Sequence, residues 1–306
     1  MVRTYTSYRG LNYTINDMPM HQGGEGSIHL VVENSRQKHV AKIYHDHKKA
    51  AKFYKKILFM VNNPPFRGLP VEISNTIVWP KDLLFSNGRF VGYIMPLVNK
   101  GIKLFSFIQT NFPKKKHGTE WLKFHRQRPD SIFIRMKICY NLAMAINLLH
   151  SSGKYVMVDM KPENILIRSN GQFSIIDIDS IQIAFNKRLL FPATAYTPEY
   201  APHEFHNGEL NIAKSLISKS FDNFSLSVIL YQILLSIHPF QASHSKYTTL
   251  QENIQHGLYV HGSNKDQLFK IPTQHNRFNY LPKKLKALFQ RALDHGFVNP
   301  NYRPRA

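Results

Sequence analysis

The chain has 306 residues, of which 43% are hydrophobic and 12% aromatic, so it is long and apolar enough to fold as one large domain or as two lobes. Forty Lys and Arg against nineteen Asp and Glu give a net charge of +21, which favours polyanionic partners such as nucleotides, nucleic acid and anionic lipid without choosing among them. The single cysteine, Cys139, excludes an internal disulfide and a cysteine-based zinc site, and no stretch reads as a signal peptide or a membrane span. We therefore expect a cytoplasmic protein with no transmembrane segment and a buried thiol, with export into a host cell left open.

The first hundred residues predict an antiparallel sheet interrupted by one helix. Four short runs are rich in β-branched and aromatic residues and are bounded by Gly, Asn or Pro, as strands require; they cover residues 26–34, 38–45, 75–86 and 89–98. Residues 45–61 carry apolar side chains near helical spacing, and the sequence "NNPP" ends that helix.

After a short link at residues 96–100 the spacing of the apolar residues becomes that of helices. Residues 131–150 place apolar side chains on one stripe closed by Ser-Ser-Gly, and residues 222–237 form a second apolar helix. Between them Asn170-Gly171 predicts a tight hairpin turn. The expected fold is α+β and bilobal, with a small antiparallel β-rich N-lobe containing one helix at residues 1–97 and a larger, mainly helical C-lobe at residues 98–306.

A glycine-rich turn lies at the start of the first predicted strand. Gly24 and Gly26 have no side chains, so the backbone N–H groups of this turn, Ser27 included, can approach phosphate oxygens closely, although a tight hairpin without a ligand explains the pattern about as well. Lys42 follows in an apolar strand, where its charge needs an anion such as a triphosphate unless it points to solvent. No histidine–acid pair accompanies Ser27 in the sequence, so we expect its hydroxyl to hydrogen-bond within the turn.

The stretch "YVMVDMKPENILI", residues 155–167, sets polar groups between two apolar runs. Asp159 is placed to accept the proton of an incoming hydroxyl or to orient it, and Lys161 to neutralise a transferred phosphoryl group. Asn164 and Asp177 offer hard oxygen ligands, and a hairpin that brings them together would hold Mg²⁺ against phosphate oxygens. These groups, with Lys42, are expected to gather around a metal-chelated triphosphate.

The motifs "GGEG", "VAK", "DMKPEN", "IID", "TPEYAPHE" and "NYRPRA", in this order, resemble the signature set of the eukaryotic-type protein kinase fold across essentially the whole chain. The resemblance implies that Glu204 pairs with Arg303 and that Asp222 opens a central helix and braces the catalytic loop. It also implies that adenine is bound by the Pro96 C=O and the Val98 N–H. More narrowly, "VWP", "VGYIMP", "DIDSIQI" and "HPF" are similar to bacterial kinase-like proteins that often carry a C-terminal helix-hairpin-helix DNA-binding segment, which is absent here.

Several positions depart from the kinase pattern. Met157-Val158 replaces His-Arg before Asp159, which removes the arginine that usually binds a phosphorylated residue of the activation loop. We therefore expect activity that does not depend on phosphorylation of that loop. His29 replaces the third glycine of the phosphate loop, stiffening it or adding a donor near the phosphates. Ile178-Asp179 replaces Phe-Gly, and Asp179 adds a metal ligand or caps a turn.

A further departure lies in the small-lobe helix, because residues 47–61 contain no acidic residue to hold Lys42. The lysine must therefore pair with Asp177 or Glu72, or take the nucleotide alone.

The resemblance implies an ATP- and Mg²⁺- (or Mn²⁺-) dependent Ser/Thr protein kinase that uses Asp159 and Lys161. The alternatives are a nucleotide-binding pseudokinase or scaffold, favoured by the missing helix glutamate, and transfer of an adenylyl group from ATP. The basic block at residues 113–128 also carries Trp121 and Phe124, and it is either a polyanion-binding patch for nucleic acid or lipid or a solvated connecting segment.

Overall fold

The computed structural model describes residues 1–32, 38–70, 73, 75–99, 101–208 and 210–306, and divides them into two compact units. The first unit is Met1–Lys100 and the second is Gly101–Ala306. The sequence analysis placed the boundary between residues 97 and 98.

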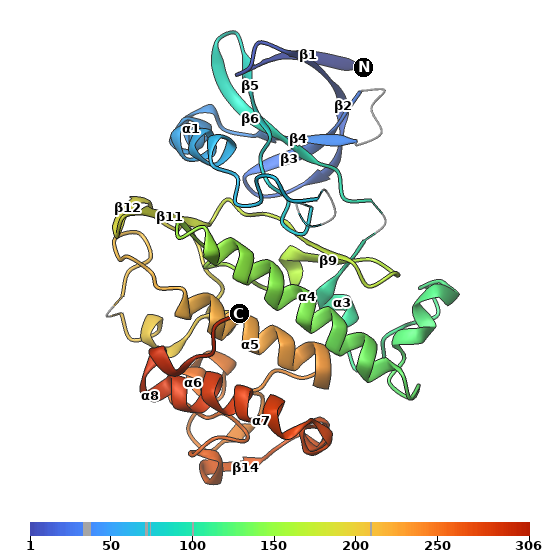
Figure 1. Cartoon of the computed structure of the whole chain (residues 1–306), viewed down its shortest axis with the longest axis vertical. Helices are drawn as coiled ribbons and strands as arrows, with labels where there is room; N and C mark the ends of the chain where they lie inside the picture. The colour runs from blue at the N-terminus through green and yellow to red at the C-terminus, as the bar shows by residue number, and fades with distance from the viewer. Residues whose placement is uncertain (33–37, 71–72, 74, 100, 209) are drawn as a thin grey trace. The chain divides into compact units, whose positions relative to one another are not determined.

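Unit 1 is a closed antiparallel barrel of six strands, seen as the ring of ribbons in Figure 1. The strands follow the order β1-β2-β3-β4-β6-β5, and β1 returns to pair with β5 through Thr6 and Ser7. The side chains that fill its core come from β2, β3, β4, β5 and β6 and include Ile15, Val31, Ala41, Leu84 and Ile94. The strand bounds are β1 Val2–Ser7, β2 Asn12–Gln22, β3 Gly26–Val31, β4 His39–Tyr44, β5 Asp82–Ser86 and β6 Arg89–Pro96.

The four predicted strands correspond to β3, β4, β5 and β6, whereas β1 and β2 were not predicted. The predicted strand at residues 75–86 was too long, because β5 begins only at Asp82. Residues 77–79 before it are buried but lie outside β5, and the indole N–H of Trp79 donates to the Met60 carbonyl at 2.8 Å. This contact fastens the segment to the helix of unit 1, and Pro80 then lacks the N–H that a ladder needs.

The predicted helix of unit 1 is α1, His47–Asn62. Asp46 caps it by accepting the Lys48 N–H at 2.7 Å and the Lys49 N–H at 3.4 Å, and Asn63 ends it. Stacking of Phe53 on Tyr44, with ring centroids 5.3 Å apart, holds the helix against β4. This packing fixes the strand that carries Lys42.

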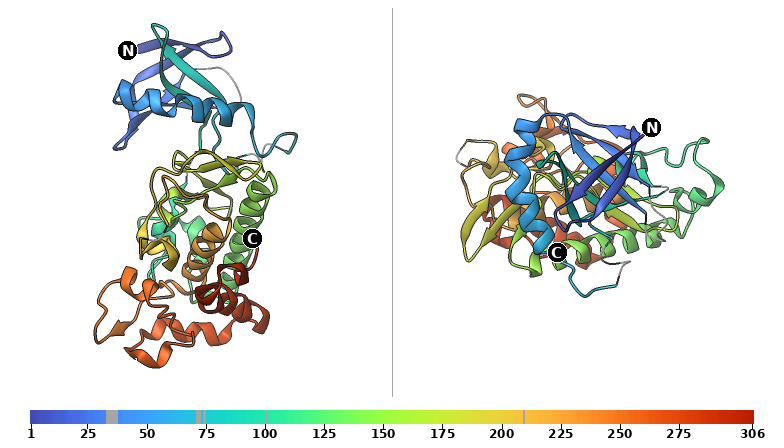
Figure 2. Two further views of the ribbon diagram at one scale, coloured as in Figure 1. Left: turned by 90° about the vertical axis from the view of Figure 1, so that its left-hand side faces the viewer. Right: turned by 90° about the horizontal axis from the view of Figure 1, so that it is seen from above.

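Unit 2 is built around two long helices, α4 (Ser131–Ser151) and α5 (Ser220–Leu235), which lie side by side in both views of Figures 1 and 2. Each matches a predicted helix within two residues. Among the described residues α4 is the one helix long and apolar enough to cross a membrane. It packs as a core helix, however, since Ile138, Leu142 and Ile146 are nearly fully buried within unit 2.

The remaining elements of unit 2 are short. Its strands are β7 Ile102–Lys103, β8 Tyr155–Val156, β9 Ile165–Ile167, β10 Phe173–Ile175, β11 Gln182–Phe185, β12 Arg188–Phe191, β13 Ser243–His244 and β14 Leu268–Lys270. Its other helices are α3 Leu104–Phe107, α6 Leu250–Gln255, α7 Lys283–Gln290 and α8 Gly296–Val298, the 3-10 turns η1 Thr119–Phe124, η2 Pro162–Asn164, η3 Pro198–Tyr200, η4 His203–Phe205, η5 Lys265–Gln267, η6 Thr273–Tyr280 and η8 Pro300–Tyr302, and the π turn η7 Arg291–His295.

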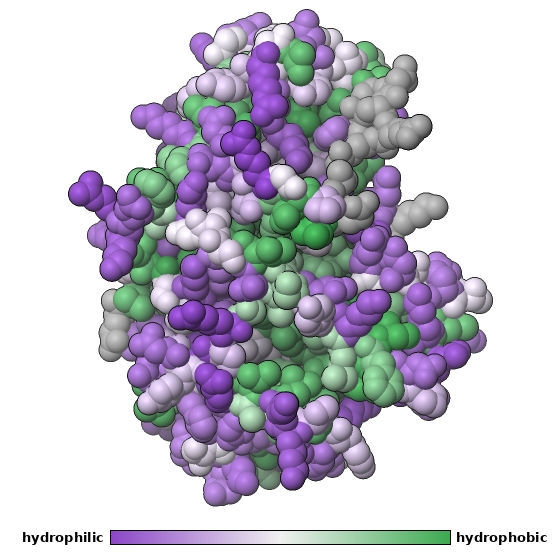
Figure 3. Space-filling model, viewed as in Figure 1, coloured by the Kyte–Doolittle hydropathy of each residue, from purple (hydrophilic) through white to green (hydrophobic). Residues whose placement is uncertain are grey.

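Much of the basic block at residues 113–128 has a structural role. Trp121 and Phe124 are buried among other aromatic rings, so they are not available to stack on nucleic-acid bases. Arg126 donates to the carbonyls of Ile233 at 3.1 Å and Leu234 at 2.5 Å, at the end of α5. A cation there complements the negative end of the helix dipole. The exposed cationic side chains of this block are Lys114, Lys115, Lys116 and Arg128, and hydrophilic residues cover much of the face in Figure 3.

The one cysteine, Cys139, is buried in α4 beside α5, with its Sγ 4.0 Å from the Leu230 carbonyl. Burial raises the pKa of its thiol to about 12, so the thiol stays protonated near neutral pH. The predicted packing role is therefore confirmed.

Candidate active site

Lys42 lies in the middle of β4 and is only 8% exposed, so it does not point to solvent. Its Nζ lies 5.9 Å from the centroid of the Tyr44 ring. On the neighbouring strand, a Cβ at Gly92 would collide with the Lys42 carbonyl, so this close approach of β4 and β6 requires glycine. Glu72, one expected partner of Lys42, falls outside the described residues.

The two glycines of the phosphate loop differ in their structural need. A Cβ at Gly26 would lie 2.5 Å from the Ile43 carbonyl oxygen, so strand pairing alone explains this glycine. A Cβ at Gly24 would meet no atom within 4 Å, so packing does not require a glycine there. The predicted phosphate-binding role of Gly24 is therefore not replaced by a packing requirement for glycine.

His29, which replaces the third glycine, uses both ring nitrogens inside unit 1. Its Nε2 lies 2.7 Å from the Ser27 hydroxyl and its Nδ1 lies 2.9 Å from the Asn16 carbonyl. The carbonyl only accepts, so Nδ1 carries the proton and Nε2 accepts from Ser27. The expected donor near the phosphates is therefore engaged elsewhere, and the ring ties β3 to β2, a contact that the sequence analysis did not foresee. The Ser27 hydroxyl hydrogen-bonds locally, as predicted.

A second histidine holds the same loop. The His45 N–H donates to the Glu25 carbonyl at 3.0 Å, and its Nε2 lies 3.0 Å from the Gly23 carbonyl. This contact requires the proton on Nε2. His45, from the motif "HDH", thus acts as a donor to the backbone, and among the residues with described positions no three His, Cys, Asp or Glu side chains form a metal cluster.

The residues expected to bind adenine follow β6. Pro96 lies opposite His39, and the ladder continues through the Leu97 N–H, which donates to the Lys38 carbonyl at 2.9 Å. The pairing of Pro96 with His39 is therefore of the non-hydrogen-bonded kind, and the missing proline N–H leaves no gap in the ladder. Val98 is half-buried just beyond the strand.

In unit 2, Asp222 braces the loop that carries Asp159. Its carboxylate is fully buried and accepts the Met157 N–H at 2.8 Å and the Val158 N–H at 2.9 Å. His150 contributes a third contact from Nε2 at 2.8 Å. The predicted brace is confirmed, and it holds Val158 at φ 65, a left-handed conformation that a β-branched residue adopts only under constraint.

Asp159 is the centre of a small polar network and its side chain is 11% exposed. Lys161 Nζ lies 3.0 Å from Asp159 Oδ2, and the Thr197 hydroxyl lies 2.7 Å from Oδ1. Lys161 also donates to Thr197 at 2.9 Å, so the three side chains close a triangle. Sequence reasoning missed Thr197, although its place directly before "PEYAPHE" was a usable signal.

Asn164 and Asp177 flank the hairpin of β9 and β10. Asn164 directly precedes β9, and the Ile176 N–H donates to its carbonyl at 2.8 Å, which sets the two chain segments side by side. The Asn164 amide NH₂ donates to the Asp159 carbonyl at 3.1 Å, which leaves its side-chain oxygen for a ligand. Asp177 has φ 57, another left-handed residue. This pair of hard oxygen donors fits a Mg²⁺ ion that keeps waters and phosphate oxygens as its other ligands.

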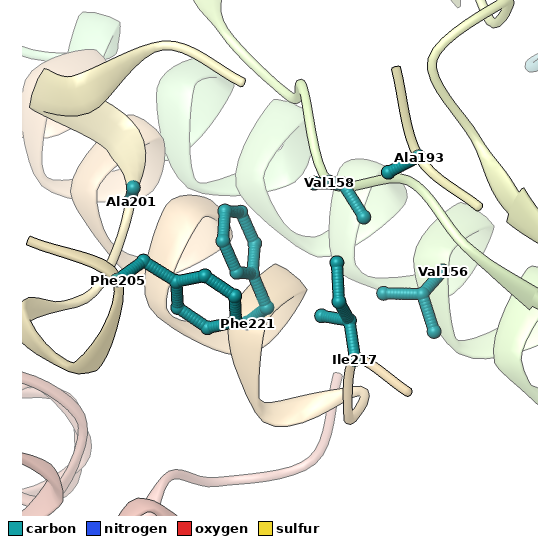
Figure 4. Close-up of a cluster of buried hydrophobic side chains, with 7 residues drawn as sticks. All are labelled: Val156, Val158, Ala193, Ala201, Phe205, Ile217 and Phe221. Atoms are coloured by element: carbon teal, nitrogen blue, oxygen red, sulfur yellow. The ribbon is translucent and has the colours of Figure 1, made fainter. Parts of the chain in front are cut away.

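The segment after Asp177 is fastened by apolar packing and by a strand. Val158 and Ala193 belong to one buried cluster with Ile217 and Phe221, drawn in Figure 4. The strand β11 pairs with β8, and the Gln182 side chain exchanges two hydrogen bonds with the Ile217 backbone, at 2.9 and 2.8 Å.

The predicted Glu204–Arg303 ion pair is confirmed. Arg303 is 4% exposed and forms a bidentate ion pair with Glu204, with Nη1 donating to Oε1 at 2.6 Å and Nη2 donating to Oε2 at 2.8 Å. It also donates to the Gly296 carbonyl at 2.8 Å. Burial raises the pKa of Glu204, but the hydrogen bonds and charge of Arg303 outweigh this and lower it overall, so the carboxylate stays ionised.

A β-barrel unit with a glycine turn and a buried lysine, followed by a helical unit with a braced Asp–Lys–Asn loop, defines the bilobal α+β class of protein kinases. The match to the protein kinase domain extends over residues 18–305, so the chain belongs to that family.

Three relatives illustrate the similarity. The chain is 31% identical over 147 residues to Aurora kinase A-B of Xenopus laevis, covering 47% of this chain and 33% of that protein. It is 31% identical over 173 residues to CBL-interacting serine/threonine-protein kinase 20 of Arabidopsis thaliana, covering 56% and 33%. It is 31% identical over 102 residues to the serine/threonine-protein kinase ppk34 of Schizosaccharomyces pombe, covering 33% and 27%. Each alignment thus spans a third or less of the relative.

Proposed function

We propose that the chain is an ATP-dependent Ser/Thr protein kinase that transfers the γ-phosphoryl group to protein hydroxyls. The observation that carries the proposal is the Asp159 carboxylate, braced through Asp222 and contacted by Lys161 at 3.0 Å and Thr197 at 2.7 Å. In this arrangement Asp159 orients the substrate hydroxyl and accepts its proton, while Lys161 offsets the charge of the transferring group. Relatives named as serine/threonine-protein kinases support the acceptor class.

The nucleotide and metal roles follow the family pattern. Lys42 and the backbone of the turn around Gly24 take the phosphates, and Val98 N–H and Pro96 C=O take the adenine edge. Asn164 and Asp177 are the residues that would hold Mg²⁺ or Mn²⁺, and a bound metal supplies charge neutralisation of the phosphates.

We further propose that activity does not depend on phosphorylation of the activation segment. The supporting observation is the buried apolar cluster that contains Val158, which stands where the kinase motif has an arginine, together with Ala193 of the activation segment. A test replaces Ser180 and Thr194, whose hydroxyls lie 3.5 Å apart in this segment, by Ala. Unchanged phosphotransfer by the phosphatase-treated double variant is expected, and a loss of about tenfold or more would contradict the proposal.

The phosphotransfer itself is tested with γ-labelled ATP and either Mg²⁺ or Mn²⁺. Wild type is expected to label itself or a generic Ser/Thr substrate, and Asp159→Ala and Asp177→Ala to label neither. Asp266→Ala, at an exposed position outside the site, is the matched control. Label arriving from α-labelled ATP instead would indicate adenylyl transfer.

The second candidate is a nucleotide-binding scaffold without phosphotransfer. The observation that favours it is that α1 has no acidic residue to hold Lys42, and that its Lys56 is buried. ATP that raises the melting temperature without any transfer of label would select this alternative. Polyanion binding through the exposed lysines of residues 113–128 is a separate proposal, and a salt titration of oligonucleotide or anionic-vesicle binding tests it.

A further inference from the structure

The helix α4 has a second apolar face, which points away from the core of unit 2. On this face the Phe133 side chain is 71% exposed, Tyr140 is 65% exposed and Met144 is 40% exposed. At about 100° and about 1.5 Å per residue, these three positions and Lys137 lie within about 60° of one another around the helix axis and extend over about 16 Å. We call this set of four residues, Phe133, Lys137, Tyr140 and Met144, the outer stripe.

The outer stripe is a continuous apolar surface and not a scatter of single residues. Isolated exposed apolar side chains are common on proteins, whereas a contiguous exposed patch marks an interaction surface. Only 39% of the most apolar 18 residues of α4 are buried within the described part of the chain. Figure 3 shows hydrophobic residues over the part of its face that α4 crosses in Figure 1. The helix therefore presents apolar surface that the core of unit 2 does not use.

The charge around the outer stripe is positive. The helix α4 contains no acidic residue, and Lys137 within the stripe is exposed. The basic block at residues 113–128 directly precedes the helix, and between residues 113 and 137 five cations are exposed against two exposed carboxylates, Glu120 and Asp130. Exposed cations beside exposed aromatic and aliphatic side chains are the composition of surfaces that bind anionic membranes.

An anionic bilayer matches both the apolar and the cationic part of this surface, whereas two other occupants match only one. Nucleic acid offers phosphates, but the rings of the basic block, Trp121 and Phe124, are buried and cannot stack on its bases. A second copy of the chain offers apolar surface, but Lys137 lies near the middle of the outer stripe, so a symmetric pairing of two stripes would set this cation against itself.

We propose that the outer stripe and the adjoining basic block bind the surface of a bilayer that contains anionic phospholipid. The helix α4 lies in the plane of the interface, with Phe133, Tyr140 and Met144 among the headgroups and the first acyl carbons. Lys137 and the exposed cations of the basic block lie at the lipid phosphates, where each contributes electrostatic attraction. The inner face of α4 stays in the core of unit 2, so binding requires no unfolding.

The test measures cosedimentation of the full chain with vesicles of phosphatidylserine and phosphatidylcholine in equal parts. Wild type is expected to bind these vesicles, to be released by salt, and to bind vesicles of phosphatidylcholine alone far more weakly. Phe133→Ser is expected to weaken the binding by about tenfold because an inserted ring leaves water, and Lys137→Glu by a similar factor. The matched control is Phe269→Ser, which removes an equally exposed ring, 71%, in β14 and should leave vesicle binding unchanged. All three positions are exposed, so unchanged melting temperatures are expected.

A second measurement locates the contact. Cys139 is buried, so a thiol introduced by Met144→Cys is labelled selectively with an environment-sensitive fluorophore. Its emission is expected to shift to the blue on addition of the anionic vesicles, and the same label introduced by Phe269→Cys is expected not to shift. Equal vesicle binding by wild type and Phe133→Ser, or an unshifted label at position 144, would overturn the inference.

Two further outcomes would assign the outer stripe to another occupant and so would also overturn the inference. They are oligonucleotide binding that Phe133→Ser abolishes, and a dimer, detected by light scattering, that the same variant dissociates. None of these measurements depends on phosphotransfer, so the membrane inference and the proposed kinase function are tested independently.

Discussion

Replacement of Asp222 by Asn tests whether the catalytic loop depends on a single buried carboxylate. The two oxygens of Asp222 accept from Met157, Val158 and His150, all within 2.9 Å, and the side chain has no exposed surface. Asn replaces one oxygen by an NH₂ group. Whichever oxygen is lost, a main-chain N–H of the loop then faces another donor, because Met157 and Val158 use different oxygens.

The cost of that change follows from the buried donor left unsatisfied. One such group costs about 1–3 kcal/mol, and loss of the charge weakens the hydrogen bonds that remain, so we expect about 3 kcal/mol of destabilisation. For a unit of this size the melting temperature should fall by about 6–12 °C. Displacement of Asp159 by about 1 Å is expected to lower phosphotransfer by about a hundredfold.

The assay follows Trp121, which is buried in unit 2, by fluorescence in a Trp79→Phe background, so that the other of the two tryptophans does not contribute. The matched control is Asp266→Asn, an exposed carboxylate of the same unit, for which less than about 0.5 kcal/mol is expected. Equal melting temperatures for the two variants would refute the reasoning that the Asp222 carboxylate holds the loop.

Three further predictions concern charge, pH and backbone contact. Glu204→Gln leaves the buried guanidinium of Arg303 uncompensated and should cost about 3–5 kcal/mol by urea denaturation, with no such loss if the pair is dispensable. The pKa of His238 is about 4 in the folded chain against 6.5, so the unfolded state binds more protons between these values, and His238 alone should cost about 2 kcal/mol of stability as pH drops from about 6.5 to 4.5. His261, whose pKa is also lowered to about 4, adds to the fall, so His238→Gln should reduce the dependence by the His238 share and not abolish it. Gly92→Ala forces a methyl group against β4 and should cost at least about 2 kcal/mol and weaken ATP binding, whereas Gly24→Ala should leave the melting temperature unchanged.

The features that the sequence predicted well are those that depend on short patterns. The burial of Lys42 follows from its apolar neighbours in one strand, and the helices α4 and α5 follow from continuous apolar content. Two contacts between distant residues, Asp222 with the catalytic loop and Glu204 with Arg303, were predicted only from the resemblance to the kinase motifs. No local pattern specifies a partner 99 positions away, as in the Glu204–Arg303 pair.

The features that the sequence analysis missed depend on long-range closure. The strand β1, "VRTYTS", holds only Val2 and Tyr5 among polar residues and so has no apolar face, and its second neighbour β5 lies almost eighty positions further on. Strand β2 contains Pro19 and irregular pairing with β3, both of which mask a strand pattern. The His29 contact with the Asn16 carbonyl exists only because these unforeseen strands lie next to each other.

One departure from the kinase pattern has a physical explanation in unit 2. Where the family motif has an arginine before the catalytic aspartate, Val158 is 1% exposed and packs with Ala193 and Phe221. An arginine at position 158 would bury a charge without a partner in the unmodified chain. A phosphate on the activation segment, in turn, would require such an arginine as its counter-charge. The segment after Asp177 instead pairs as β11 with β8 and is held by Gln182. Apolar packing and backbone pairing thus hold the segment after Asp177, where the kinase motif implies an ion pair between an arginine and a phosphate. Because this packing is present before any modification, we expect the segment to be ready for catalysis in the unmodified chain.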